Sequence, residues 1–119
     1  MKTQVLYDLI VSYRISDMMF GVRIEEACKR SSAVFKKSDS LNDLRSIATI
    51  NDRVLIICDL VSVKSELGAI TKLSKEKNWK VFGYYPHIDT DTSTLAHSLG
   101  VEYIVSRSAL QPKLNALLR

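Results

Sequence analysis

Glycine is scarce in this sequence, and its four glycines stand far apart. They are Gly21, Gly68, Gly83 and Gly100. A loop that cradles a dinucleotide needs several glycines close together, because its backbone must approach the phosphate groups. The spacing therefore argues against a dinucleotide or flavin site.

Cysteine and histidine are also few. Cys58 lies inside an apolar stretch and Cys28 on the apolar side of a predicted helix, so we expect two buried free thiols rather than a disulfide. His87 and His97 each lack a nearby cysteine or second histidine, which makes a metal site improbable. We expect no metal, no cofactor and a reducing cytoplasm as the location.

Long hydrophobic runs are missing, and none approaches the length of a membrane span. The apolar patch near the N-terminus is interrupted by Asp8 and is followed by no small-residue cleavage site, so we expect neither a signal peptide nor a membrane partner. The formal net charge is +4, but the basic residues are scattered without interleaved aromatics. This pattern is typical of a solvated surface, and we expect no nucleic-acid partner.

The most informative stretch that is present reads RVLIICDL, at residues 53–60. Residues 54–58 are apolar and rich in β-branched side chains, which is typical of a strand buried on both faces of a parallel sheet. Asp59 follows this strand directly. Because ligands of such sheets gather outside the carboxyl ends of the strands, Asp59 is the best single candidate for a functional residue.

Strand and helix patterns alternate along the whole chain. The predicted strands cover residues 5–11, 33–36, 54–58, 80–85 and 102–106. The predicted helices cover residues 17–30, 41–49, 62–78 and 90–99. Ser40 caps the second, either Ser62 or Ser65 opens the third, Asn78 ends the third, and Gly100 closes the fourth. A last helix opens at Ser108, with Gln111 completing a capping box. Five β–α units predict an α/β fold with one doubly wound parallel sheet in the flavodoxin-like order 2-1-3-4-5. We expect residues 1–119 to form a single domain.

The first predicted helix is apolar on more than one side. One side carries a core-facing stripe that begins at Phe20 and Ile24. Met18 and Val22 lie opposite, with Met19 between them. Either loops cover these three side chains, or they form a surface for a protein partner or a homo-oligomer.

The order of elements, with an aspartate ending the third strand, resembles the receiver domain of response regulators, the CheY-like fold. The resemblance covers essentially the whole chain. It implies that Asp59 stands at the phosphoacceptor position. The threonine or serine of the family falls on Tyr85, and its lysine falls on Arg107, followed by Ser108 instead of proline. The aromatic switch position falls on Ile104.

The resemblance also implies two acidic residues after the first strand, which hold Mg²⁺ in the family. If that strand covers residues 5–11, the pair falls on Ser12 and Tyr13; if it extends to Ile15, the pair falls on Ser16 and Asp17. Either alignment leaves Asp59 with at most one acidic helper. Mg²⁺ wants octahedral oxygen ligands that include carboxylates, so the sequence predicts a degenerate phosphorylation pocket.

The predicted pocket contains Asp59, Arg107, Tyr85, Asp17 and His87. We expect Asp59 and Arg107 to form an ion pair and Tyr85 to fill the space of the absent phosphate. The favoured function is a stand-alone receiver-like signalling module that acts by protein–protein interaction, is not phosphorylated and is not an enzyme. One alternative is a working phosphoacceptor that uses Mg²⁺ at Asp59, and another is a small flavodoxin-like enzyme with Asp59 and His87 as acid and base.

Overall fold

A computed structural model describes residues 7–31, 33–47, 53–85 and 90–118. Five strands form one parallel sheet in the order β2-β1-β3-β4-β5. They are β1 (Leu9–Tyr13), β2 (Val34–Ser38), β3 (Val54–Asp59), β4 (Lys80–Tyr85) and β5 (Tyr103–Ser106). The predicted α/β fold class and strand order are thereby confirmed.

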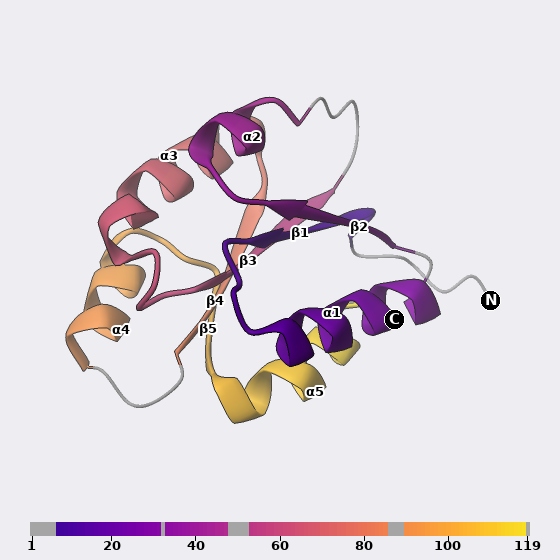
Figure 1. Ribbon diagram of the computed structural model, residues 1–119. Helices are drawn as coiled ribbons and strands as arrows, with labels where there is room; N and C mark the ends of the chain where they lie inside the picture. Colours follow the sequence, from indigo (N-terminus) through magenta and orange to yellow (C-terminus); the bar gives the residue numbers. More distant parts are fainter. Residues whose placement is uncertain (1–6, 32, 48–52, 86–89, 119) are drawn as a thin grey trace.

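Helices cover both faces of this sheet (Figure 1). They are α1 (Met18–Ser31), α2 (Leu41–Arg45), the short η1 (Lys64–Glu66), α3 (Leu67–Lys77), α4 (Thr90–Ser98) and α5 (Arg107–Leu117). Helices α1 and α5 lie on one face, and α2, α3 and α4 lie on the other. None of the helices in the described ranges is long and apolar enough to cross a membrane.

Strand β3 forms the centre of two hydrophobic clusters, one on each face of the sheet. Successive side chains of a strand point to opposite faces, so Leu55 and Ile57 pack towards α1 and α5, whereas Ile56 and Cys58 pack towards α2 and α3. All four are fully buried. This two-sided burial is what the apolar run predicted, and each such aliphatic side chain contributes about 1.5–3 kcal/mol to folding.

Strand β1 begins later than the sequence suggested. It covers Leu9–Tyr13, and its five residues are all buried. Asp8 stays just outside the strand, where its carboxylate accepts the backbone N–H of Arg53 at 3.0 Å and pairs with its guanidinium. Ser12 is polar but fits inside the strand, because a central strand takes side chains on both faces.

Local end signals were predicted with mixed success. Ser40 caps α2 through a bond from the backbone N–H of Asp43, as expected, and Gly100 adopts a φ of 81° after α4. The capping box at Ser108 was wrong. Helix α5 begins at Arg107, directly after β5, with Ser106 in the N-cap position.

The two thiols are buried and free, as predicted. Burial raises the pKa of Cys28 to about 11 and that of Cys58 to about 12, so both stay protonated at neutral pH.

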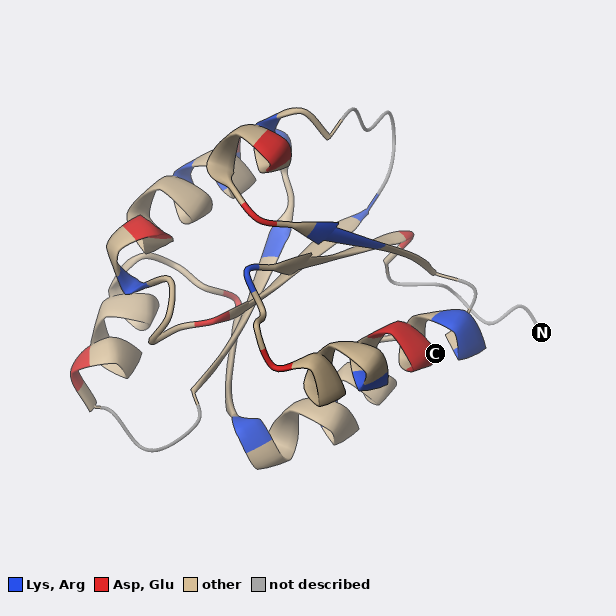
Figure 2. Ribbon diagram, in the orientation of Figure 1, with Lys and Arg blue, Asp and Glu red and all other residues tan. Residues whose placement is uncertain are grey.

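Basic residues are spread over both helical layers and over β2, an outer strand of the sheet that carries Lys36 and Lys37 (Figure 2). Val34 of the same strand is 63% exposed.

Candidate functional site

The carboxyl ends of the strands gather several polar side chains at one edge of the sheet. Asp59 ends β3 and lies opposite Tyr84 of β4 in the strand register. Asp17 precedes α1, and Arg107 is the first residue of α5. The charges of Asp17, Asp59 and Arg107 all act on the Tyr84 phenol, so these side chains lie in the same region.

Asp59 caps the turn that follows its own strand. Its Oδ1 atom accepts the backbone N–H of Val61 at 3.0 Å and that of Ser62 at 3.3 Å. The Oδ2 atom has no hydrogen bond to any of the described residues, and the residue is half-buried. One carboxylate oxygen therefore has a structural role, and the other has no hydrogen-bond partner among the described residues.

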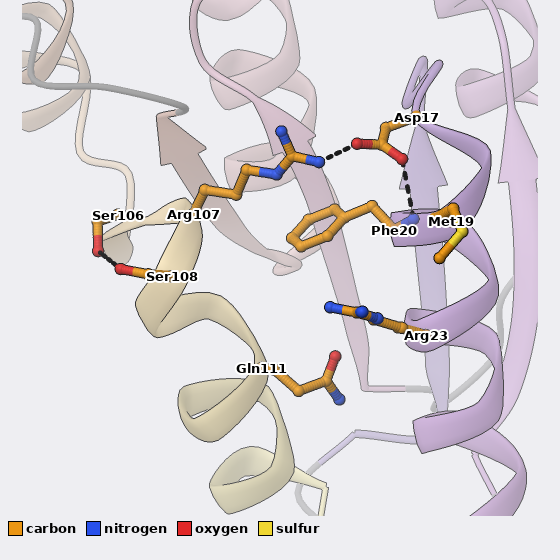
Figure 3. Close-up of a pocket in the computed structure, with 8 residues that line it drawn as sticks. All are labelled: Asp17, Met19, Phe20, Arg23, Ser106, Arg107, Ser108 and Gln111. Atoms are coloured by element: carbon orange, nitrogen blue, oxygen red, sulfur yellow. Dashed lines mark hydrogen bonds and ion pairs between the residues drawn. The ribbon is translucent and has the colours of Figure 1, made fainter.

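Arg107 forms its ion pair with Asp17, so the predicted pair with Asp59 is wrong (Figure 3). The Arg107 guanidinium also lies 5.2 Å from the ring centroid of Phe20. The reason for the difference is the start of α5: because Arg107 lies in the first turn of a helix beside α1, its side chain need not reach over β4. The two side chains are 47% and 35% exposed, so the pair stabilises the fold by only about 0.2–1 kcal/mol.

Asp17 also begins α1. Its Oδ1 atom accepts the backbone N–H of Phe20 at 3.1 Å, which satisfies one of the unpaired donors of the first turn. Both oxygens of Asp17 are thus engaged, one by the helix and one by Arg107. This second role agrees with the prediction that Asp17 opens the helix.

Tyr84 takes the position that had been expected for Tyr85. Tyr84 is 3% exposed, its ring lies 4.9 Å from that of Phe20, and its pKa is raised above the usual range, chiefly by burial and then by the charge of Asp59. Tyr85 points to the other face and packs against the cluster under α2 and α3. A shift of one residue along a strand exchanges the two faces, so the correction follows from the register of β4.

The described residues do not offer a fit for Mg²⁺ at this edge. They contain no group of three or more His, Cys, Asp or Glu side chains placed to hold a metal ion. Asp17 is engaged by Arg107, and Ser12, one of the positions that the resemblance gave to an acid, is buried in β1. His87, the remaining member of the predicted pocket, lies outside the described residues.

A cavity of about 620 Å³ opens between α1 and α5, next to the Asp17–Arg107 pair (Figure 3). Its lining residues are Asp17, Met19, Phe20, Arg23, Ser106, Arg107, Ser108 and Gln111. Sequence reasoning did not single out Arg23, and it gave Gln111 only a capping role for the last helix. Their helical spacing from Phe20 and Arg107 was a usable signal, because residues three or four apart lie on one side of a helix.

The exposed side of α1 carries the three apolar residues that the sequence singled out. Met18 is 83% exposed, Met19 69% and Val22 52%. Together with Arg23 and Glu26 they line a shallow hollow of about 430 Å³. None of the loops in the described ranges covers them.

Comparisons with known proteins place the fold. No protein-family model and no curated protein matches the sequence. A solved structure, described as a response regulator from Thermotoga maritima, matches with a TM-score of 0.69, and the match covers 94% of this chain and 98% of that one. The chain has a receiver-like fold. Its identity to that protein is 13%, so the likeness speaks for the fold alone.

Within the receiver-like fold, the site has its own chemistry. Asp59 ends the third strand, where the resemblance implies a phosphoacceptor. Around it the structure gathers a buried phenol and an arginine that is already paired with an acid. The shared fold therefore fixes where the candidate site lies, at the carboxyl ends of the strands, and the residues of this chain decide which chemistry the site allows.

Proposed function

We propose that the protein is a cytoplasmic receiver-like signalling module that acts through protein–protein contacts and is not switched by phosphorylation of Asp59. The observation that carries this proposal is the ion pair of Asp17 with Arg107. Asp17 is the described acid best placed to help Asp59 hold a cation, and the guanidinium already neutralises it. The two buried free thiols support a reducing compartment.

The physical argument concerns the charge that phosphoryl transfer develops. A divalent metal usually neutralises the phosphate oxygens, and its position is fixed by carboxylates. Asp59 alone is a poor Mg²⁺ site, since one of its oxygens accepts two backbone hydrogen bonds. The buried ring of Tyr84 beside Asp59 further limits the room for a phosphoryl group.

One observation favours the alternative of a working phosphoacceptor. Asp59 Oδ2 has no hydrogen bond to the described residues, and the Asp17–Arg107 pair is open to water. A cation at high concentration would compete with Arg107 for Asp17. The alternative and the main proposal differ in whether Asp59 accepts a phosphoryl group, which can be measured.

The test is incubation with a small phosphodonor, or with beryllofluoride, at millimolar Mg²⁺. We expect no adduct by intact-mass measurement, because the metal site is incomplete. A receiver domain that accepts phosphate under the same conditions serves as the positive control. An adduct that disappears in Asp59→Asn would overturn the proposal and establish the alternative.

We also propose that the exposed apolar side of α1 joins two copies of the chain. Monomeric soluble proteins rarely leave such a patch uncovered, and methionine suits adaptable contacts. Met18, Met19 and Val22 stand next to one another on the helix surface, and their exposure supports this proposal. The other surface available for association consists of α4, β5 and α5.

Light scattering tests the association. We expect the unmodified protein to be a dimer or larger oligomer and the double variant Met18→Glu, Val22→Glu to be a monomer, because the added charges would be buried at the contact. Arg30→Glu, on the same helix but outside the patch, is the matched control and should leave the mass unchanged. A monomer at high concentration would contradict the proposal, and an oligomer unaffected by the double variant would move the contact to α4, β5 and α5.

A further inference from the structure

The cavity between α1 and α5 carries positive charge without a matching carboxylate. Arg107 is neutralised by Asp17, but Arg23 has no ion pair with any of the described residues. In Figure 3, Arg23 extends from α1 into the gap, towards Gln111 of α5. An arginine in this position offers a planar fork of donors, which suits a phosphate or a carboxylate.

Two serines line the end of the cavity where α5 begins, but their hydroxyl groups point away from Arg23, to the other side of α5 (Figure 3). The Oγ atoms of Ser106 and Ser108 are 3.2 Å apart. Ser106 is in the N-cap position, yet its side chain makes no capping hydrogen bond, so it does not satisfy the first N–H groups of α5. The serine hydroxyls are therefore not part of the anion site, and Arg23 is its unpaired cationic group.

Gln111, in the same cavity, needs a hydrogen-bond donor rather than an acceptor. Its Nε2 atom donates to Asn115 Oδ1 at 3.2 Å, which fixes the orientation of the amide. Its Oε1 atom is buried and accepts no hydrogen bond. A buried acceptor without a donor is unfavourable, so this atom calls for a ligand that carries a hydroxyl or another donor.

We propose that this cavity binds a hydroxyl-bearing phosphate ester. The phosphate group is held by Arg23, and a ligand hydroxyl donates to Gln111 Oε1. Free phosphate shares the anionic chemistry but is too small to meet both ends of a cavity of about 620 Å³. Such a ligand would regulate the module from the α1–α5 side, so the inference goes beyond the proposed function and does not depend on it.

The test is calorimetric titration at constant ionic strength with glycerol phosphate, propyl phosphate and inorganic phosphate. We expect saturable binding that is tightest for glycerol phosphate, because only this ester combines the anion with free hydroxyls. Arg23→Gln should weaken binding about tenfold or more, since a charged hydrogen bond is lost. Arg30→Gln, which makes the same substitution on the same helix outside the cavity, should have no effect.

Two further variants locate the ligand. Gln111→Leu should remove the preference for glycerol phosphate over propyl phosphate, and Ser108→Ala should leave both affinities unchanged, because the Ser108 hydroxyl points away from Arg23. Asp59→Asn should leave binding unchanged, which separates this site from the phosphoacceptor position and its own mass-based test. The inference is overturned by the absence of saturable binding, by equal losses in Arg23→Gln and Arg30→Gln, by loss of binding in Asp59→Asn, or by equal affinity for the three anions.

Discussion

Replacing Tyr84 with alanine is expected to lower the free energy of unfolding by about 3–5 kcal/mol. The side chain is 3% exposed and packs on the Phe20 ring at 4.9 Å between centroids. The substitution removes that aromatic contact and leaves a void under α1 and α5, which the surrounding strands cannot fill. A denaturant unfolding curve measures the loss, as a lower midpoint with an unchanged dependence of the unfolding free energy on denaturant concentration.

Tyr84→Phe is the matched control, because it keeps the ring and removes only the hydroxyl. We expect a small change at neutral pH and a distinct effect in alkali. The folded protein raises the pKa of Tyr84 above its usual value near 10, so the protein gains stability from the neutral phenol below that pH and loses it as the pH rises further. Tyr84→Phe should therefore flatten the alkaline decline, and a decline of unchanged steepness would show that other groups cause it.

Replacing Gly83 with alanine is the second change with a large expected effect, about 1–3 kcal/mol of destabilisation. A Cβ atom at this position would lie 2.3 Å from Leu60 Cδ2 and 2.7 Å from Leu60 Cγ. Leu60 is fully buried and its backbone N–H donates to the carbonyl of Tyr84 at 2.8 Å, so it has little room to move. Overpacking at this point would strain β4 next to the candidate site.

Gly68→Ala provides the comparison, because a Cβ atom there meets nothing within 4 Å. Gly68 lies in α3, where alanine is favoured over glycine, so this variant should gain about 0.5–1 kcal/mol. Opposite shifts of the thermal midpoint in the two variants would support the close approach of Leu60 to β4. A neutral Gly83→Ala would mean that the leucine moves aside without cost.

The architecture was predictable because its signals are local. The run at residues 54–58 is apolar on both faces, which only a central strand of a covered sheet requires. The ends of elements were marked in the same way, as at Ser40, at Asn78 in a left-handed conformation and at Gly100. Signals of this kind depend on residues that are close in the sequence, so they can be recognised without knowledge of the tertiary contacts.

The site was less predictable, because its contacts depend on registers and helix starts. A shift of one residue along β4 brings Tyr84, not Tyr85, to the side of Asp59. A start of α5 at Arg107 rather than Ser108 directs the arginine to Asp17. Element ends are the least certain part of any sequence-based assignment, and a site built at the ends of elements inherits that uncertainty.

The outer position of β2 has a consequence for how copies of the chain can meet. An outer strand presents unpaired backbone groups that another strand can join, and continued joining of this kind produces fibres. Lys36 and Lys37 lie on this strand and are both exposed, so a second copy docking there would bring like charges together. At the opposite side of the sheet, β5 is only four residues long and offers a short template. Growth of the sheet from molecule to molecule is thereby disfavoured, which leaves the helical surfaces as the places for controlled association.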